Sequence, residues 1–501
     1  HPANRPGIPQ MALRARLSPP REERDDWPWH HAKWTVLSAS LLMGGDRRME
    51  AENYLAGGYG IRLAMEARKA GWTSMGKLAK VWQPSRLKGI QVSREFGYPY
   101  LAATQVFDLR PVPRKFLSLD KTPDADNLFV ADGQILVTRS GSVGRATLAH
   151  KPHEAVIISD DLLRVVPQQE KLWGWLYAYL RAPQTRAMMT SAQYGHIIKH
   201  LEVSHLNALP MPVLRDELLR DFRTKVQTIL DARNQAQALL MEAESRFEAA
   251  IGTPDTQDIG EAGFSIRASG IFAGRRRMEG FFHNPAVRAI RAHFSARKLK
   301  TTALAAGGFN VWLPNRFKRI TAEDGVPLLD SSDLFEINPD ISRLIADGDF
   351  GDLHKGKVKA GWLMVSRSGQ IYGLNGSVAI ANSFHEGKVV SDDIIRIAPR
   401  ADALIRPGYL FVAMTHPTLG RPLVKAQIYG SSIPHLDVVD VEALEIVRLQ
   451  PNIEDTIADL AEQGAALLAK ADLLENDIAA DAEAIIDRFI AGDTREIVVM
   501  R

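Results

Sequence analysis

The sequence has 501 residues, too many for one ordinary hydrophobic core, so we expect two to four domains. A hydrophobic content of 45% and a charged content of 24% are typical of a globular protein and argue against wholesale disorder. The chain contains no cysteine, which excludes disulfides, cysteine-ligated zinc and a thiol nucleophile, and fits a cytoplasmic location. No apolar run approaches the ~20 residues that a membrane span needs, the best stretch being 34–43, so we expect no membrane contact.

The N-terminal part is predicted to lie outside the fold. Residues 1–26 are rich in Pro and Arg and lack the apolar core of a signal peptide. Because the chain begins with His1 rather than Met, we expect residues 1–10 to be an added segment. The first folded domain is therefore expected over 27–213.

Within 27–213 the predicted strands are short and mixed with helices. Residues 134–138 and 155–158 read as strands, joined through the glycine turn 141–144. A short amphipathic helix is expected over 173–180. We expect an α+β domain with a mixed, largely antiparallel sheet.

A long helix is expected next, over 214–252. Apolar and small residues step by four and three from Phe222 to Ala250, with Arg233 among them, and Gly252 and Pro254 then end the pattern. A 3.5-residue spacing over several heptads is typical of a coiled-coil seam.

The following domain, expected over 253–450, repeats the first. Six sequence blocks return in the same order at offsets that drift only between 228 and 235 residues, and the drift marks loop insertions. The matched blocks are 45–50 with 274–279, 82–88 with 312–318, 97–101 with 325–329, 139–141 with 367–369, 159–167 with 391–399, and 194–201 with 429–436. A second long helix over 451–501 follows, again with a heptad-like seam from Ile453 to Phe489. We expect the two helices to pair as an antiparallel coiled coil; the alternative is that each packs only on its own domain.

The net charge of +3 is unevenly distributed along the chain. Between Ile453 and Ile490 only Lys470 and Arg488 oppose ten acidic residues. Outside 214–251 and 453–490 the chain carries 54 basic and 42 acidic residues, about +12. The globular copies are therefore the plausible phosphate-binding surfaces, whereas an acid-rich helix suits a protein partner.

No catalytic or metal-binding motif emerges from the sequence. The acid pairs Asp160-Asp161 and Asp392-Asp393 adjoin strands, where successive side chains point to opposite faces, so we assign them to a turn or strand entry. His196 and His200 have helical ligand spacing, but Ser431 replaces His196 in the second copy, which argues against a metal.

The arrangement resembles the specificity subunit of type I restriction-modification systems. The likeness rests on the motif at 48–54, on the strand, Arg-x-Gly and glycine turn at 133–144, and on the ending at 194–212, within two copies that each precede a long helix. It departs at Glu50, where the family usually has Asp, and at 445–449, which lacks the Leu-Pro-x-Pro form.

The resemblance implies a non-catalytic DNA-recognition subunit that serves in defence against phage. Each copy would be a target recognition domain reading half of a bipartite, asymmetric site in double-stranded DNA. The helices would fix the spacing of the half-sites and dock two methyltransferase subunits and, in some complexes, restriction or translocase subunits. No cofactor is expected in this chain, since S-adenosylmethionine and ATP with Mg²⁺ would belong to the partner subunits.

Comparison of the two copies separates the candidate DNA contacts into two kinds. Residues that the copies share suit the DNA backbone, because the two half-sites normally differ, and residues that differ suit base reading. The backbone candidates are Arg86, Lys88, Arg139, Arg145, His200, Arg316, Lys318, Arg367 and His435. The base-reading candidates are Arg110, Arg114, Lys115, Lys199, His354, Lys355, Lys425 and Gln427. For Arg139 and Arg367, phosphate contact and structural hydrogen bonding remain open.

Three other functions are weighed against this one. The chain could be the equivalent subunit of a different defence or modification complex, a self-contained nuclease, or a protein-only scaffold built on its helices. DNA cleavage with magnesium alone would favour the nuclease, and absent DNA binding the scaffold.

Overall fold

The structure, a computed structural model, describes residues 57–192, 200–254, 263–272, 276–347, 353–430 and 432–498. The apolar stretch at 34–43, the motif at 48–54, His196 and Lys199 lie outside these residues. The chain divides into two compact units: among the described residues, one holds 57–231 with 473–498 and the other holds 232–472. Each long helix lies partly in one unit and partly in the other.

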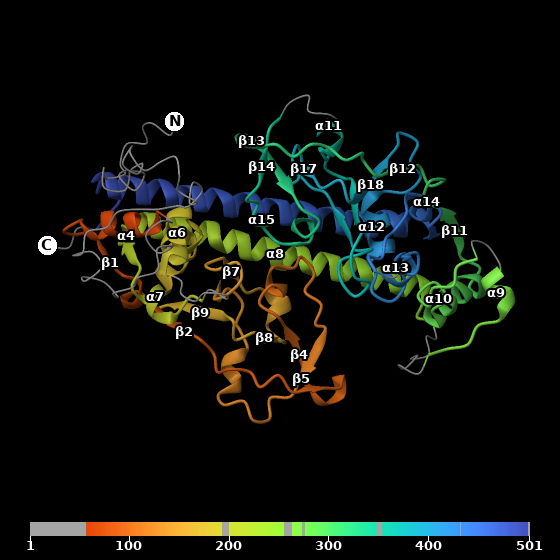
Figure 1. Cartoon of the computed structure of the whole chain (residues 1–501), viewed down its shortest axis with the longest axis horizontal. Helices are drawn as coiled ribbons and strands as arrows, with labels where there is room; N and C mark the ends of the chain where they lie inside the picture. Colours follow the sequence, from red (N-terminus) through yellow and green to blue (C-terminus); the bar gives the residue numbers. More distant parts are fainter. Residues whose placement is uncertain are drawn as a thin grey trace, which may run out of the picture. The chain divides into compact units, whose positions relative to one another are not determined.

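The first copy of the repeat contains short strands interleaved with helices, as Figure 1 shows. Its helices are α4 (Gly58–Glu66), α5 (Trp173–Arg181), α6 (Pro183–Ala192) and α7 (Val203–Asn207). Its strands are β1 (Trp72–Ser74), β2 (Ala79–Trp82), β3 (Gln91–Val92), β4 (Tyr98–Leu101), β5 (Lys115–Leu117), β6 (Ile135–Thr138), β7 (Ala146–Leu148), β8 (Ile157–Ile158), β9 (Leu162–Pro167) and β10 (Pro210–Pro212).

The second copy also combines short strands with helices. Its helices are α9 (Ala268–Phe272), α10 (Pro285–Ala296), α11 (Leu353–Gly356), α12 (Pro407–Thr415), α13 (Arg421–Lys425) and α14 (Val438–Glu442). Its strands are β11 (Lys300–Ala303), β12 (Phe309–Trp312), β13 (Thr321–Leu329), β14 (Leu344–Ile345), β15 (Leu363–Ser366), β16 (Val378–Ile380), β17 (Val389–Val390), β18 (Ile394–Pro399) and β19 (Glu445–Arg448). The predicted mixture of helices and sheets is confirmed.

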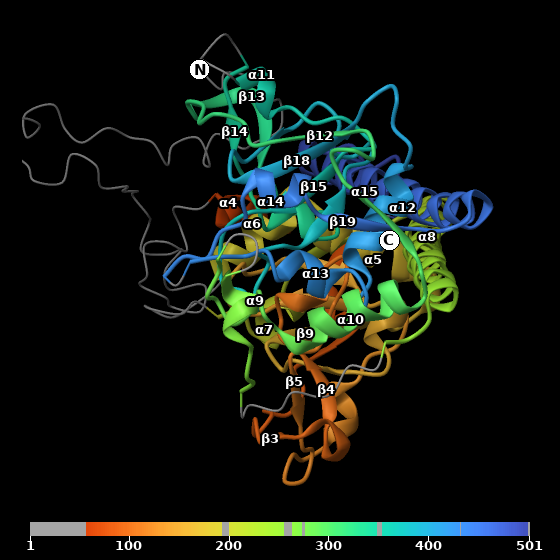
Figure 2. The same cartoon turned by 90° about the vertical axis from the view of Figure 1, so that its right-hand side faces the viewer.

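The sheets of the two copies share their strand order. An antiparallel sheet β2-β9-β6-β7 in the first copy corresponds to β12-β18-β15-β16 in the second. The smaller sheets match in part: β5-β4-β8 corresponds to β14-β13-β17, while β3 has no separate counterpart. Each contains one parallel pair, β4 with β8 and β13 with β17. The pairs β1-β10 and β11-β19 complete the match. Figure 2 shows β3, β4 and β5 of the first copy lying together.

The predicted connection between the strands at 134–138 and 155–158 is wrong. The glycine turn 141–144 joins β6 to β7, a three-residue strand that the sequence reading did not identify, rather than to the strand predicted at 155–158. That strand, β8, pairs in parallel with β4 in the other sheet. A turn this short joins two adjacent antiparallel strands, so β6 must pair with the segment directly after it. That segment, β7, is too short to show an alternating sequence pattern. The helix predicted over 173–180 is present as α5.

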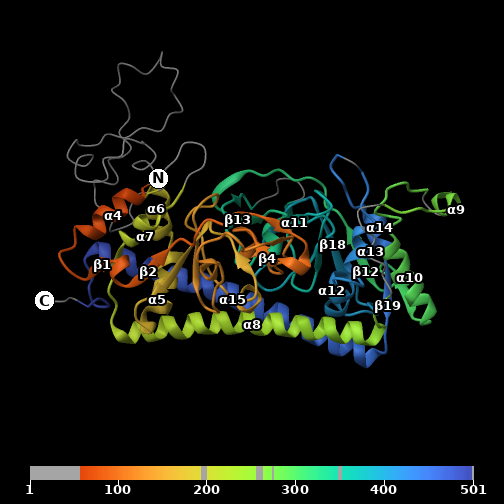
Figure 3. The same cartoon turned by 90° about the horizontal axis from the view of Figure 1, so that it is seen from below.

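The long helices are α8 (Asp216–Ile251) and α15 (Pro451–Ala491), and Gly252 ends α8 in a left-handed conformation with a φ of 80°. In the first unit Lys225 of α8 pairs with Asp481 of α15 at 3.0 Å. In the second unit Arg233 pairs with Asp472 at 3.3 Å, and both side chains are buried. Within each unit, the segments of α8 and α15 lie side by side (Figures 1 and 3). No helix among the described residues is both long and apolar enough to cross a bilayer.

Candidate nucleic-acid interface

A basic pair lies on the same extended segment in each copy. The segment that follows β2 carries Arg86 and Lys88, and the segment that follows β12 carries Arg316 and Lys318; all four side chains are exposed. The residue between the two cations of each pair points inward: Leu87 packs against a hydrophobic cluster, and Phe317 is buried in the core with 7% of its surface exposed. Alternation in an extended chain therefore presents both cations of each pair on one side.

The basic pairs are available to an anion. Among the described residues, none of these four side chains forms an ion pair with a carboxylate. Arg319, one residue beyond the second pair, differs because Asp392 binds it at 2.6 Å. Two exposed cations, spaced two residues apart on an extended chain, suit contacts to successive phosphates.

The shared arginines Arg139 and Arg367 already have protein partners. Arg139 lies 3.3 Å from Glu202 and 3.6 Å from Asp161, its Nη1 is 3.2 Å from Nδ1 of His200, and only 16% of its side chain is exposed. Arg367 lies 3.2 Å from Asp393. In both copies the arginine backbone also bonds to neighbours: its N–H donates to Asp161 or Asp393, and its carbonyl accepts from Leu201 or Leu436. This geometry favours a structural role over phosphate contact.

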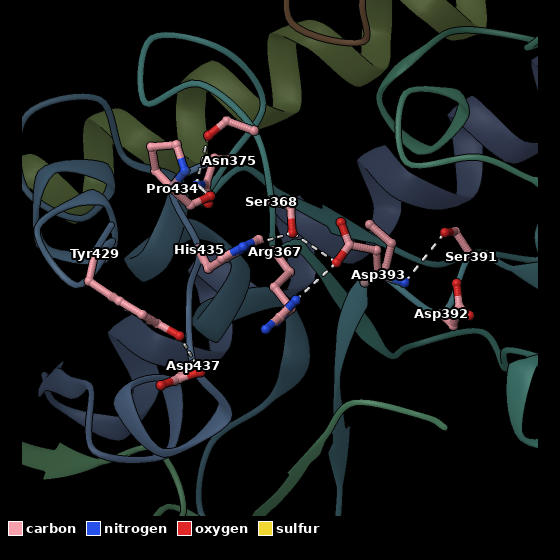
Figure 4. A network of polar contacts seen from close by, with 12 residues as sticks. Arg367, Ser368, Asn375, Ser391, Asp392, Asp393, Tyr429, Pro434, His435 and Asp437 are labelled. Carbon is pink, nitrogen blue, oxygen red and sulfur yellow. Dashed lines mark hydrogen bonds and ion pairs between the residues drawn. The ribbon is translucent and has the colours of Figure 1, made fainter. Parts of the chain in front are cut away.

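Figure 4 shows the second of these clusters. Ser368 Oγ lies 2.8 Å from Oδ1 of Asp393 and 2.8 Å from Nδ1 of His435. A hydrolytic triad needs the histidine between serine and aspartate, so that the ring can take the serine proton. Here the serine lies between the other two, so the arrangement fixes His435 rather than activating a nucleophile. Among the described residues, no group of three or more His, Cys, Asp or Glu could hold a metal.

Arg145, another backbone candidate, belongs to the interior of the first copy. Its side chain is 7% exposed, and its guanidinium stacks 3.8 Å from the ring centre of Phe107. A cation desolvated on an aromatic face contributes to packing and is poorly placed to reach DNA. The sequence reading missed this burial because Arg145 follows an exposed glycine turn.

A buried arginine explains why the block at 159–167 returns at 391–399. Arg164 on β9 and Arg396 on β18 are fully buried. Arg164 donates to the carbonyls of Ile158 and Ser159, both at 3.0 Å. Arg396 donates to the matching carbonyls of Val390 at 2.7 Å and Ser391 at 2.9 Å.

Each buried arginine keeps its charge with help from a nearby acid. Burial lowers the pKa of both arginines to about 10, while Asp160 and Asp392 oppose that shift. The first acid of each Asp-Asp pair therefore offsets a buried cation, and the second binds the shared arginine. The assignment of these acids to strand entry agrees with their contacts. The sequence offered a signal for the buried arginine, namely an Arg inside an apolar strand in both copies.

The base-reading candidates lie on several elements. Arg114 and Lys115 are exposed at the start of β5, and Arg110 is half-buried in the loop before it. His354 and Lys355 are exposed on α11. Lys425 and Gln427 are half-buried and lie at the end of α13 and just after it.

Lys425 and Gln427 are engaged with the protein. The ammonium of Lys425 donates to the carbonyls of Ile371 and Gly373, and the carbonyl of Gln427 accepts from Arg277 at 2.7 Å. The structure thus joins Lys425 to the β15–β16 loop (367–377), of which the sequence analysis included only Arg367 among the candidate DNA contacts. Four more residues separate the two turn glycines here, Gly369 and Gly376, than in the first copy, where they are Gly141 and Gly144.

Comparisons with known proteins give matches to solved structures only. No family model and no curated protein matches the chain. The chain is similar to the S subunit of a type I restriction-modification system from M. genitalium, with 12% identity and a TM-score of 0.29 over 87% of this chain and 98% of that one.

Two further structures give matches of the same order. The HsdS subunit from Thermoanaerobacter tengcongensis has 12% identity and a TM-score of 0.24 over 84% of this chain and 96% of that one. The type IIG restriction endonuclease BpuSI has 15% identity and a TM-score of 0.25 over 34% of this chain and 28% of that one. Of these three structures, the two S subunits cover most of this chain and the endonuclease covers about a third of it.

Proposed function

We propose that this chain is a non-catalytic specificity subunit whose two copies each recognise one half of a bipartite, asymmetric site in double-stranded DNA. The observation that carries the proposal is the exposed basic pair, Arg86 with Lys88 and Arg316 with Lys318, at the same place on the same strand order in both copies. Recognition of two different half-sites requires similar contacts to the DNA backbone in both copies and different loops for the bases. The two basic pairs would supply the backbone contacts.

Base reading is assigned to the residues that differ between the copies. In the first copy these are Arg110, Arg114 and Lys115, with Lys199 outside the described residues. In the second copy they are His354 and Lys355, with Lys425 and Gln427 acting near the β15–β16 loop. Arg and Lys suit guanine edges, and Gln suits adenine edges. His200 and His435 belong with the shared arginines, which position the turns that carry these loops.

The long helices serve as a spacer and as docking surfaces. Ion pairs between α8 and α15 in each unit support an antiparallel coiled coil that would fix the distance between half-sites. The ten acids between Ile453 and Ile490 would repel DNA and suit protein partners. These partners would be two methyltransferase subunits that bind S-adenosylmethionine, together with ATP- and Mg²⁺-dependent restriction subunits, in the cytoplasm.

Methylome sequencing of a host with and without the gene tests the proposal. We expect adenine methylation at one bipartite motif, of the form half-site, fixed gap, half-site, to disappear when the gene is deleted and to return with a plasmid copy. An unchanged methylome would contradict the proposal. Purified chain that cuts DNA with magnesium alone would replace it with the nuclease, and chain that binds no DNA would replace it with the scaffold.

A further inference from the structure

The β15–β16 loop presents an aromatic ring to solvent from a firmly held backbone. Tyr372, at the middle of the loop, is 80% exposed, although its neighbour Ile371 packs inward against the core of the second copy. Tyrosine side chains usually bury most of the ring. A tyrosine ring exposed on a fixed loop therefore indicates a contact with a ligand.

Several contacts hold the loop in place. Asn375, whose side chain is fully buried, donates to the carbonyls of Gly369 at 3.0 Å and Pro434 at 2.8 Å. Asn375 and Pro434 lie beside the cluster in Figure 4. Lys425 donates to the carbonyls on both sides of Tyr372, those of Ile371 and Gly373. A loop fixed at both ends and on both sides of its tip loses little conformational entropy when it binds a ligand.

A second aromatic residue lies against the tip of the loop. The rings of Tyr372 and Phe281 meet edge to face, with centroids 6.3 Å apart, and Phe281 is itself 36% exposed. The segment that carries Phe281 is anchored by Arg277, which donates to the carbonyls of Gln427 and Ile428. Exposed Arg276 lies next to this anchor. The surface is thus an aromatic pair whose two segments are held by Lys425 and Arg277, with exposed Arg276 on the same segment as Phe281.

We propose that Tyr372 is a specificity-determining residue that contacts a base pair of the half-site read by the second copy, with Lys425 as its positioning residue. The inference rests on the proposed function. The loop belongs to the second copy alone, because the first copy has the short turn 141–144 at the same place. Aromatic side chains contact thymine methyl groups or wedge between base steps.

This assignment changes the reading of Lys425. A lysine whose ammonium donates hydrogen bonds to two backbone carbonyls has few N–H groups left for a guanine edge. Lys425 acts instead by fixing the direction in which Tyr372 points. In this proposal Tyr372 contacts the base pair and Lys425 positions it, whereas the sequence analysis had assigned base reading to Lys425 itself.

The test selects binding sites from a randomised duplex library with the purified full chain and compares Tyr372→Ala with the unchanged chain. We expect Tyr372→Ala to lose sequence preference at one or two adjacent base pairs of one half-site, and specific affinity to fall about tenfold. Non-specific affinity should stay the same. Tyr372→Phe should keep most of the preference if the ring makes the contact. Leu404→Ala, which truncates a side chain 66% exposed in the same copy, is the matched control.

Lys425 is tested at the same base pairs. Lys425→Met should weaken preference there, and Lys425→Arg, which can still donate to two carbonyls, should restore it. The inference fails if Tyr372→Ala selects the same motif with the same affinity, or if preference falls in both half-sites. It also fails if the variant loses partner-subunit assembly and keeps its motif, since Tyr372 would then belong to a protein interface. If the unchanged chain selects no motif at all, the proposed function itself has failed.

Discussion

Arg164 and Arg396 show how a single residue type can hold a strand in a core. Each guanidinium fills the place of an apolar side chain. It donates to backbone carbonyls at the end of the preceding strand, β8 or β17, and in the turn that leads to its own strand. A buried cation is costly unless its donors are used, so removing it leaves several carbonyls without donors. We expect Arg164→Met to lower the free energy of unfolding by about 3 kcal/mol. Thermal melting of the full chain, followed by circular dichroism, measures the loss.

The second copy and the surface supply the comparisons for this prediction. Arg396→Met should cost about as much, because its contacts are the same, whereas Arg86→Met removes an exposed charge and should change stability by less than ~0.5 kcal/mol. A change for Arg164→Met no larger than that for Arg86→Met would show that water or a shifted backbone satisfies the carbonyls instead.

Glu475 is the residue of α15 that makes the stability of this element depend on pH. Its carboxyl is 1% exposed in the first unit, where it accepts a hydrogen bond from the hydroxyl of Tyr177. Burial raises the pKa of Glu475 to about 8; Arg145 opposes the shift, and Arg181, 3.8 Å away, would also favour the charged form. Desolvation dominates, because the carboxyl is surrounded by protein and its ion pair with Arg181 is long.

The sign of the pH effect follows from that raised pKa. The folded state holds a proton that the unfolded state, with a pKa near 4.5, has released. Stability is therefore fully present below pH 4.5 and falls as the pH rises towards 8, by at most about 1.4 kcal/mol per unit. Glu475→Gln should remove this decline, so that the variant gains most over the unchanged chain at pH 8. Asp477→Asn, an exposed site on the same helix, should leave the pH profile of the melting temperature unaltered.

Elements that follow a strong local pattern could be predicted from the sequence, and those that depend on distant partners could not. The heptad-like seam and Gly252 predict a long helix in the region of α8, and an apolar face predicts α5. In contrast, β7 and β8 have three and two residues and are defined only by the strands they pair with. The same applies to the site. The Arg86 and Lys88 pair is visible in the sequence, whereas the burial of Arg145 and the anchoring of Lys425 arise from residues far along the chain.

The doubled architecture makes a quantitative prediction for DNA binding by the whole molecule. Each phosphate contact releases about 0.9 counterion, so it adds about 0.9 to the slope of log affinity against log salt. Arg86→Ala with Lys88→Ala should lower that slope by about 1.8, and Arg316→Ala with Lys318→Ala by about as much. Because each pair lies on its own copy with its own sheets, the effects should add to about 3.6 in the fourfold variant. Fluorescence anisotropy at four salt concentrations measures the slopes.

Arg139→Ala separates the basic pairs from the shared arginines in the same experiment. Arg139 forms ion pairs with Glu202 and Asp161. Its removal should therefore leave the slope of log affinity against log salt unchanged, even if stability falls. A drop of about 0.9 for Arg139→Ala would instead assign that arginine to phosphate. If only one basic pair altered the slope, one copy would bind the backbone without the other, and a bipartite site would need a different second anchor. Equal contributions from both pairs are what a duplicated reader of two half-sites requires.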